Sequence, residues 1–299
     1  MEQAMTYRTH DVPVDGGTLR VGEWPSDDPS APTVLAAHGI TASHLAWAPI
    51  AQACPQVRLI APDLRGRGRS AGLPGPYGMA RHAADLEAVC EALELPRAVV
   101  VGHSMGGFVA VVAAHLYPDR FSRVLLIDGG LPLAIPAGIS KESMLDALGP
   151  AIQRLSMTFP DRASYLEFWK QHPAFAAGRW SQAVADYVDY DLTGTEPELH
   201  PSTSLEAVRQ DSIDQYDGGV VQAAIVELRQ PVSLLTAPRG FLNETPGLYS
   251  PSEMARWRTE LPAMTVREVP YVNHYTIVMG DTGACAVADE VLGLLDLGC

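Results

Sequence analysis

The feature that most constrains the fold of this chain is a run of β-branched residues that breaks into a serine flanked by glycines. Residues 99–107 read Val-Val-Val-Gly-His-Ser-Met-Gly-Gly, and a helix-like stretch follows as far as Tyr117. Gly102 and Gly106 flank Ser104 at the two positions where a Cβ would crowd a tight turn. The pattern predicts a buried strand, a sharp turn and a helix, with the Ser104 hydroxyl presented above the end of the strand.

Similar apolar runs recur along the chain, with turns and helical patterns between them. The runs lie at residues 33–38, 57–62, 98–102, 124–128, 232–236 and 264–269. Continuous apolar runs without alternation are typical of strands buried on both faces, and helices between such strands are typical of crossovers in a parallel sheet. We therefore predict a doubly wound α/β fold.

Four motifs, in sequence order, resemble those of the α/β-hydrolase family. They are His38-Gly39, the segment PDLRGRGRS at 62–70, the segment GHSMGG at 102–107, and Asn273-His274. The resemblance implies a mostly parallel eight-stranded sheet flanked by helices, with an inserted helical cap and catalytic residues in the order Ser, acid, His. We expect residues 1–131 and 231–299 to form the core, and residues 132–230 to form the cap.

The expected cap segment has apolar residues at helical spacing and no strand-like run. The helical pattern is carried by Met144, Leu148, Ile152 and Leu155, and again by Trp180, Ala183, Val184, Tyr187 and Val188. The segment is also rich in large aromatic side chains, which either line a pocket above Ser104 or pack the cap onto the core. From these we assign Trp180 and Phe168 to the substrate pocket as a hypothesis.

A serine hydroxyl is a poor nucleophile near neutral pH and needs a base within hydrogen-bond reach, usually an imidazole. Of the nine histidines, His274 follows the apolar run 266–269 by one short loop, which returns it to the carboxyl ends of the strands. We predict Ser104 as the nucleophile and His274 as the base. We expect His38 to hold the oxyanion loop, His103 to point away from Ser104, and the other six to have solvent or packing roles.

The position of the acid departs from the commonest family pattern. The loop after the predicted seventh strand, 234–240, has no carboxylate where most members carry one, and the next along the chain is Glu244. Asp128 ends the predicted sixth strand and is followed by two glycines that would allow a sharp turn toward His274. Some family members use this alternative position. We favour Asp128 as the acid and keep Glu244 as the alternative.

The resemblance also implies two backbone donors for an oxyanion. In this family they are the N–H after the nucleophile and an N–H from the loop after the third strand, which correspond to Met105 and Ile40. The turn after the fourth strand, rich in Gly and Arg, matches neither glycine-rich phosphate-binding fingerprint. Its Asp63, Arg65 and Arg69 are interpreted as structural residues that tie down neighbouring loops.

Composition excludes several classes of partner. A net charge of −14 opposes binding to nucleic acid or to an anionic membrane, because both are polyanions. No apolar stretch has membrane-spanning length, and the N-terminus lacks the pattern of a secretory signal. The four cysteines, at 54, 90, 285 and 299, show neither zinc-site nor disulfide spacing, so we expect no metal and a reducing, cytoplasmic location.

Taken together, the motifs predict a cofactor-independent serine hydrolase that cleaves a carboxylic ester, a lactone or a related small acyl substrate through Ser104, His274 and Asp128. Other reactions on the same scaffold are C–C bond hydrolysis, acyl transfer and cofactor-free peroxidase chemistry. A hypothesis of another class is a non-catalytic receptor for a small ligand, which turnover of a generic ester would exclude. The sequence leaves the substrate and the oligomeric state open.

Overall fold

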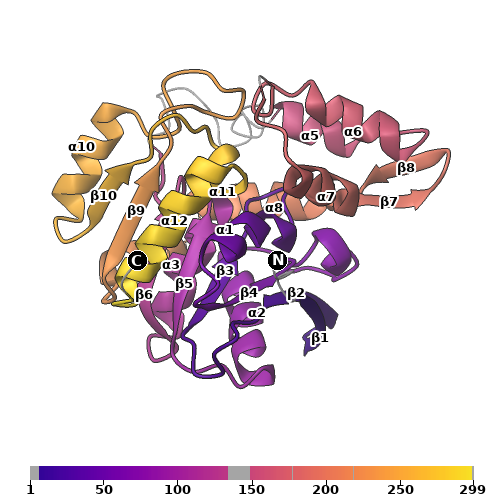
Figure 1. The fold of residues 1–299 in the computed structure, drawn as a ribbon. Coiled ribbons are helices and arrows are strands. Elements are labelled where there is room, and N and C mark those ends of the chain that lie inside the picture. The colour runs from indigo at the N-terminus through magenta and orange to yellow at the C-terminus, as the bar shows by residue number, and fades with distance from the viewer. Residues whose placement is uncertain (1–6, 134–148, 177, 218, 298–299) are drawn as a thin grey trace.

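An eight-stranded sheet forms the centre of the molecule, in a computed structural model that describes residues 7–133, 149–176, 178–217 and 219–297. The strand order is β1-β2-β4-β3-β5-β6-β9-β10 (Figure 1). The strands are β1 (Arg8–Val14), β2 (Gly17–Trp24), β3 (Thr33–Ala37), β4 (Arg58–Pro62), β5 (Ala98–His103), β6 (Phe121–Ile127), β9 (Val232–Thr236) and β10 (Thr265–Glu268). β2 pairs antiparallel with β1 and β4, and all other neighbours are parallel. The predicted doubly wound α/β fold is confirmed.

The central strands are buried because helices cover both faces of the sheet. Every residue of β3 and β5 is buried, as their continuous apolar sequences predict. In register, Gly102 of β5 lies beside Ala37 of β3 on one side and Leu126 of β6 on the other. Since these strands are parallel, their carboxyl ends meet at one edge, and the residues after each strand are brought together there.

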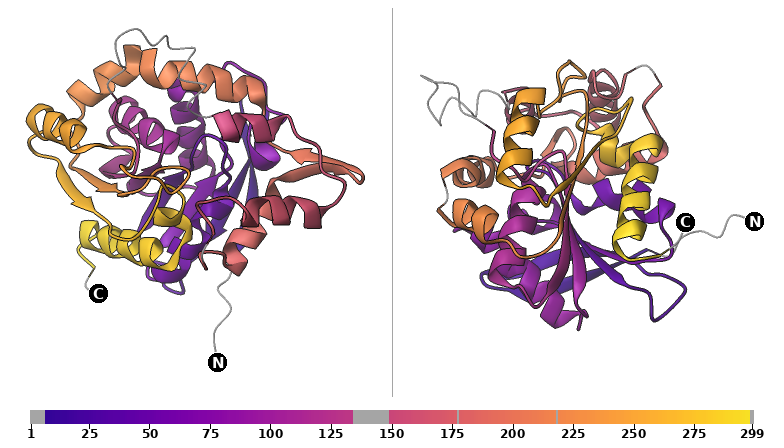
Figure 2. Two further views of the ribbon diagram at one scale, coloured as in Figure 1. Left: turned by 90° about the horizontal axis from the view of Figure 1, so that it is seen from above. Right: turned by 90° about the vertical axis from the view of Figure 1, so that its left-hand side faces the viewer.

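Helices lie in two layers, one on each face of the sheet (Figure 2). One layer contains α1 (Ala48–Ala53), α11 (Thr276–Met279) and α12 (Asp281–Leu294), which share an apolar core. The second apolar core contains α2 (Met79–Ala92), α3 (Met105–Leu116), α9 (Gly219–Glu227) and α10 (Pro251–Glu260). Two short 3₁₀ helices, η1 (His44–Trp47) and η2 (Gly68–Ser70), follow β3 and β4. The molecule is thus a three-layer sandwich with the core on both sides of the sheet.

The segment between β6 and β9 contains α5 (Gly149–Leu155), α6 (Arg162–Lys170), α7 (Gln182–Asp191), β7 (Leu192–Thr195), β8 (Glu198–Pro201), α8 (Leu205–Asp217) and α9. The helices α5 to α7 and the β7–β8 pair are grouped at the upper right of Figure 1. The expectation of no strand here is wrong, because β7 and β8 form an antiparallel pair that Phe159 extends by bridging to Leu199.

The two helical patterns predicted in this segment match the observed helices to different extents. The pattern from Trp180 to Val188 coincides largely with α7, and Ile152 and Leu155 lie in α5. Met144 and Leu148 lie outside the described residues. Helices α8 and α9 pack against α2, and α9 also packs against α3, so the end of the segment covers the core. No helix of the described ranges combines the length and the apolar composition needed to span a bilayer.

Packing at the start of α3 leaves no room for a side chain. A Cβ on Gly106 would lie 2.0 Å from the carbonyl oxygen of Ala37, and one on Gly102 would lie 2.0 Å from the carbonyl oxygen of Gly106. Both contacts are with main-chain atoms of packed elements, which cannot rotate away as a side chain could. The two glycines therefore set how closely α3 approaches β3 and β5.

We expect Gly106→Ala to lower the free energy of unfolding by about 3 kcal/mol, because the added methyl forces the backbone of α3 away from β3. Urea denaturation followed by far-UV circular dichroism measures the change. Gly72→Ala is the control, since Gly72 is exposed and its Cβ would have no neighbour within 4 Å; it should shift stability by less than about 0.5 kcal/mol. Equal losses from both substitutions would contradict the steric argument.

Candidate active site

Ser104 occupies a strained turn between β5 and α3. Its backbone has φ 55° and ψ −123°, a conformation that L-residues rarely adopt. The turn is fixed by its neighbours, since the Ser104 N–H donates to the carbonyl of Ile127 over 3.0 Å and the Ser104 carbonyl accepts from Gly107 over 3.0 Å. The side chain is half-buried and lines a cavity with His274. The strand, turn and helix predicted around Ser104 are present.

His274 is held by contacts on its ring and on its main chain. Its Nδ1 lies 2.7 Å from Asp128 Oδ2, so the Nδ1–H donates a hydrogen bond to the carboxylate, and Nε2 is the nitrogen without a proton in the neutral ring. The His274 carbonyl accepts a 2.8 Å hydrogen bond from Nε2 of His103. The preceding Asn273 accepts hydrogen bonds at Oδ1 from the N–H groups of Tyr275 and Thr276. These contacts fix both the ring and the loop that carries it.

Asp128 stands at the end of β6 in a second strained position. Its φ is 43°, in the left-handed region, and its side chain is fully buried. Oδ1 accepts a 3.1 Å hydrogen bond from the Ala237 N–H, and Oδ2 faces His274. A Cβ on Gly129 would lie 2.2 Å from the Ser104 carbonyl oxygen, so glycine is required where the two turns pack together. The carboxylate is therefore aimed by its own backbone and by β9.

Glu244, the alternative acid, lies elsewhere. It is exposed, and its carboxylate accepts a 2.7 Å hydrogen bond from the N–H of Leu242. In the part of the chain that the structure describes, it makes no hydrogen bond to His274. Geometry thus favours Asp128 as the partner of His274.

The expected oxyanion donors flank Ser104. Ile40 lies in a turn closed by a 3.1 Å hydrogen bond from the Ala42 N–H to the Gly39 carbonyl, which also accepts from His38 Nδ1 over 2.8 Å. In a trans peptide the Ile40 N–H points opposite to that carbonyl. Met105 is the first residue of α3, where an N–H has no partner within the helix. A Cβ on Gly39 would lie 3.3 Å from the Ser104 Cβ, so this turn lies directly against the serine.

A cavity of about 30 Å³ lies at the Ser104 and His274 side chains. Its walls are Gly39, Ile40, Thr41, Ala42, Ala46, His103, Ser104, Tyr187, Phe241, His274, Tyr275, Val278 and Met279. The Phe241 ring centroid is 4.1 Å from that of His274. Phe241 follows β9, and Tyr275 directly follows His274, but neither carries a sequence signal for a wall residue. The surroundings of the reacting atoms are apolar and aromatic.

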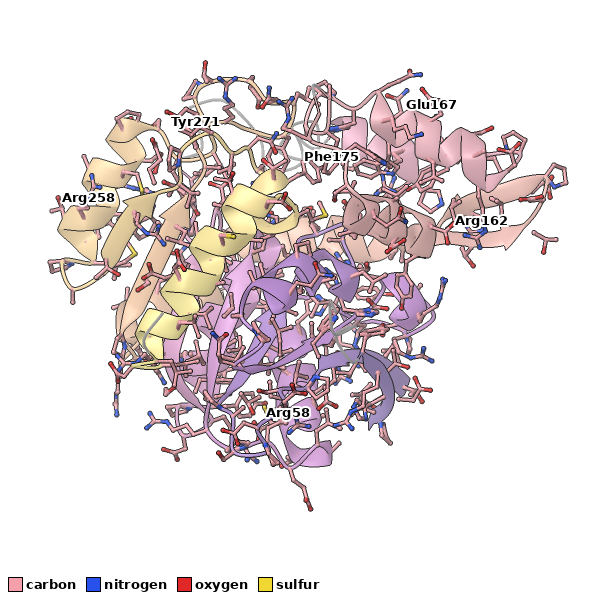
Figure 3. The ribbon with its side chains drawn as sticks, viewed as in Figure 1. Arg58, Arg162, Glu167, Phe175, Arg258 and Tyr271 are labelled. Carbon is pink, nitrogen blue, oxygen red and sulfur yellow. The ribbon has the colours of Figure 1, made fainter. Side chains whose placement is uncertain are left out.

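The two predicted pocket residues lie outside these walls. Phe168 packs within the segment between β6 and β9, with its ring centroid 5.6 Å from that of Phe159. Trp180 lines a separate cavity with Tyr271, which is exposed at the top of the molecule in Figure 3. The same view shows Arg162 and Glu167 at the outer side of this segment, while Phe175 lies closer to the centre. The assignment of Phe168 and Trp180 to substrate binding stays a prediction.

Burial keeps the neighbouring histidines neutral. It lowers the pKa of His38 to about 3, and Nε2 of this ring accepts from the Leu64 N–H over 2.9 Å. Burial, and to a smaller extent electrostatic interaction with His274, hold the pKa of His103 well below its ordinary value. The His103 side chain stays close to the site, because its ring centroid lies 4.7 Å from that of His274. Among the described residues, no three His, Cys, Asp or Glu side chains gather as a metal site.

A second buried histidine and aspartate anchor α7 near this cavity. His44 Nδ1 donates to Asp63 Oδ1 over 2.7 Å, and the hydroxyl of Tyr190 in α7 donates to Asp63 Oδ2 over 2.6 Å. Burial raises the pKa of the Asp63 carboxyl, but the charge of His44 and hydrogen bonds from His44 and Tyr190 outweigh it and lower the pKa to about 2. Since α7 also carries Tyr187, this pair helps to place a wall of the cavity.

Asp63 should make stability depend on pH. Because its native pKa lies below the unfolded value near 4, its contribution of about 2 kcal/mol is present above pH 4 and is lost as pH falls toward 2. Asp63→Asn should lower the free energy of unfolding at pH 7 and flatten its decrease between pH 5 and 2, as measured by urea denaturation. The control Asp11→Asn removes a carboxylate that is 59% exposed and should leave the profile nearly unchanged. An unchanged profile for Asp63→Asn would contradict the assignment.

Comparison with known proteins places these features in context. The model of the alpha/beta hydrolase fold family matches residues 32–148. A putative carbamate hydrolase, RutD of Variovorax paradoxus, is 30% identical over 201 residues, which are 64% of this chain and 71% of that protein. A 2-(acetamidomethylene)succinate hydrolase of Mesorhizobium japonicum is 29% identical and covers 82% of each chain.

Solved structures agree on the fold. The crystal structure of E-2-(acetamidomethylene)succinate hydrolase aligns over 97% of this chain and 100% of its own, with a TM-score of 0.78 and 23% identity.

The first curated relatives, three mycobacterial proteins, are 33% identical over 102 residues, and the chain spans only 30% of their length.

Proposed function

Because the chain belongs to the α/β-hydrolase family, we propose that it is a cofactor-independent serine hydrolase acting on a carboxylic ester, a lactone or a related small acyl compound. The observation that carries the proposal is the 2.7 Å hydrogen bond between His274 and Asp128 at a cavity that Ser104 also lines. A nucleophile, a base and an orienting acid are the set that acyl transfer to a serine requires.

In the acylation step, Ser104 Oγ attacks the acyl carbon while His274 Nε2 takes the hydroxyl proton. The carbonyl electron pair moves onto oxygen, which the N–H groups of Met105 and Ile40 receive. The tetrahedral intermediate then collapses as His274 gives the proton to the leaving oxygen, which departs as an alcohol. The hydrogen-bonded turn at 39–42 and the helix start at Met105 support this role, because N–H groups on such fixed elements need no reorientation.

Deacylation repeats the sequence with water. His274 takes a proton from the water, whose oxygen attacks the acyl carbon, and Ser104 leaves after receiving the proton back. Asp128 keeps Nδ1 protonated, so that Nε2 is the basic nitrogen in both halves, and its charge stabilises the imidazolium formed between them. The buried carboxylate serves this role without itself changing protonation state.

The walls of the cavity indicate the substrate class. Ile40, Tyr187, Phe241 and Tyr275 surround the reacting atoms, which suits an uncharged acyl group of modest size. The names of the carbamate hydrolase and of the acetamidomethylene compound hydrolase fit reaction at an acyl carbon of a small molecule.

We place the cap at residues 132–230, as the sequence suggests. Within it, α7 supports this role by supplying Tyr187 to the cavity wall. We also propose a cytoplasmic location, on the grounds of the cysteine usage given above.

Removing the nucleophile should abolish turnover. We expect Ser104→Ala to lose at least about a thousand-fold in kcat on p-nitrophenyl acetate while keeping the wild-type circular dichroism spectrum. A fluorophosphonate should add its mass to Ser104 and to no other residue, as read by peptide mass spectrometry. Ser122→Ala is a control for loss of a serine, since Ser122 hydrogen-bonds the Ala98 carbonyl at the other end of β5. Labelling elsewhere, or an active Ser104→Ala protein, would exclude this mechanism.

The two candidate acids should separate in kinetics. Asp128→Asn should lower kcat by at least about a hundred-fold with little change in KM, because the amide cannot fix the same tautomer of His274. Glu244→Gln should stay within about three-fold of wild type, because Glu244 contacts the Leu242 N–H instead. The reverse ranking would assign the acid to the loop after β9.

A further inference from the structure

The guanidinium of Arg67 is buried directly behind the turn at residues 39–42, called here the oxyanion turn because it carries the expected donor Ile40. Arg67 follows β4 and has no exposed surface. Its Nε donates to the carbonyl of Ile40 over 2.9 Å, and Nη1 donates to the carbonyl of Arg65 over 2.9 Å. Its Nη2 lies 3.8 Å from the sulfur of Met105. One side chain therefore contacts both residues that carry the proposed oxyanion donors.

Asp211 holds Arg67 from the opposite side. This residue of α8 is also fully buried, and its Oδ2 accepts hydrogen bonds from Arg67 Nη1 and from Nε2 of His82. Its Oδ1 accepts a 2.6 Å hydrogen bond from the Gly78 N–H at the start of α2. The carboxylate thus ties α8 and α2 to the guanidinium, and a fork held at several points has little freedom to move.

We propose that Arg67, held by Asp211, is a positioning residue that fixes the Ile40 and Met105 donors for the oxyanion; this inference rests on the proposed function. The Gly39–Ala42 turn has its own closing hydrogen bond, but that bond sets only the shape of the turn. Arg67 fixes where the turn lies relative to α3, because it contacts Ile40 on one element and Met105 on the other. Oxyanion stabilisation depends on donors held about 3 Å from the oxygen, so a small displacement of either one lowers the rate.

Arg65 provides a matched control two positions earlier in the same turn. It is buried to the same degree, forms a two-point ion pair with Asp85 and donates to the carbonyls of Pro74 and Asp15. It therefore has the same chemistry as Arg67, namely one buried carboxylate and main-chain carbonyls. Within the described residues, no hydrogen bond of the Arg65 side chain reaches Ile40 or Met105. If Arg67 has a purely structural role, substitution of either arginine should lower kcat equally. If Arg67 positions the donors, its substitution should lower kcat more than that of Arg65.

The experiment compares Arg67→Lys, Arg65→Lys and Asp211→Asn with the wild type. Lysine keeps the positive charge but lacks the fork that reaches the carboxylate and the carbonyls together. Active-site titration with a fluorophosphonate counts functional protein. For each variant, kcat and KM are measured on p-nitrophenyl acetate, together with Tm. The inhibition constant of an aryl trifluoromethyl ketone, which forms an oxyanion on Ser104, is compared with that of the matching secondary alcohol, which does not.

We expect Arg67→Lys to lower kcat by about 10- to 100-fold and to weaken the ketone by a similar factor, with KM and alcohol binding within about three-fold. Asp211→Asn should also lower kcat and ketone affinity, by a smaller factor. If Arg67→Lys does not fold, the comparison is made with Asp211→Asn instead. Arg65→Lys should lower Tm comparably but keep kcat and ketone affinity within about three-fold. Equal kinetic losses at the two arginines, or unchanged ketone affinity in Arg67→Lys, would overturn the inference alone. A wild type with neither turnover nor labelling at Ser104 would overturn the proposed function and this inference together.

Discussion

The geometry of the site depends on main-chain contact between the ends of three neighbouring strands. Gly106 lies against the carbonyl of Ala37, and Gly129 lies against the main chain of Ser104, both at distances that exclude a Cβ. This contact brings two strained residues together, Ser104 after β5 and Asp128 after β6, each with a positive φ. The strain is held in place by the sheet, since each residue donates its N–H to the carbonyl of an adjacent strand, at Ile127 and Leu235. Backbone packing and main-chain hydrogen bonds thus set the positions of Ser104 and Asp128.

Much of this arrangement could be predicted because its signals are local. Continuous apolar runs identified the central strands, and the residues directly after them, such as Ser104 and Asp128, could be assigned to one edge of the sheet. The fold prediction is confirmed, while the catalytic roles remain predictions that the geometry favours. The β7–β8 pair carries little sequence signal, because each strand has only four residues and β7 begins directly after the strong helical pattern of α7. The bridge that extends the pair joins Leu199 to Phe159, forty positions away, and no local pattern indicates it.

The polar contacts behind the site could not be predicted, for a different reason. Arg67 and Asp211 are 144 positions apart, and Asp63 and Tyr190 are 127 apart. In the sequence, each of these residues is typical of a solvated surface or a turn. The crossover from β6 to β9 brings α7 and α8 against the loops after β3 and β4. A buried charge needs a charged or hydrogen-bonding partner. If Arg67 and Asp63 were known to be buried, such partners could be inferred. Their burial, however, follows from the topology, which the local sequence does not give.

Two kinds of contact hold the segment between β6 and β9, namely buried polar contacts and packing between aromatic side chains. Hydrogen bonds and ion pairs are directional, and breaking one leaves an unpaired charge in a low-dielectric interior, so Asp63 and Asp211 specify where α7 and α8 lie. Aromatic contacts such as those among Trp169, Phe175 and Tyr275 are less directional and tolerate changes of size. The turn at residues 39–42 is fixed through the first set, because Arg67 joins it to Asp211, whereas Tyr275 of the cavity wall packs in the second. The cavity wall at Tyr275 can therefore change in size while the turn at residues 39–42 keeps its position.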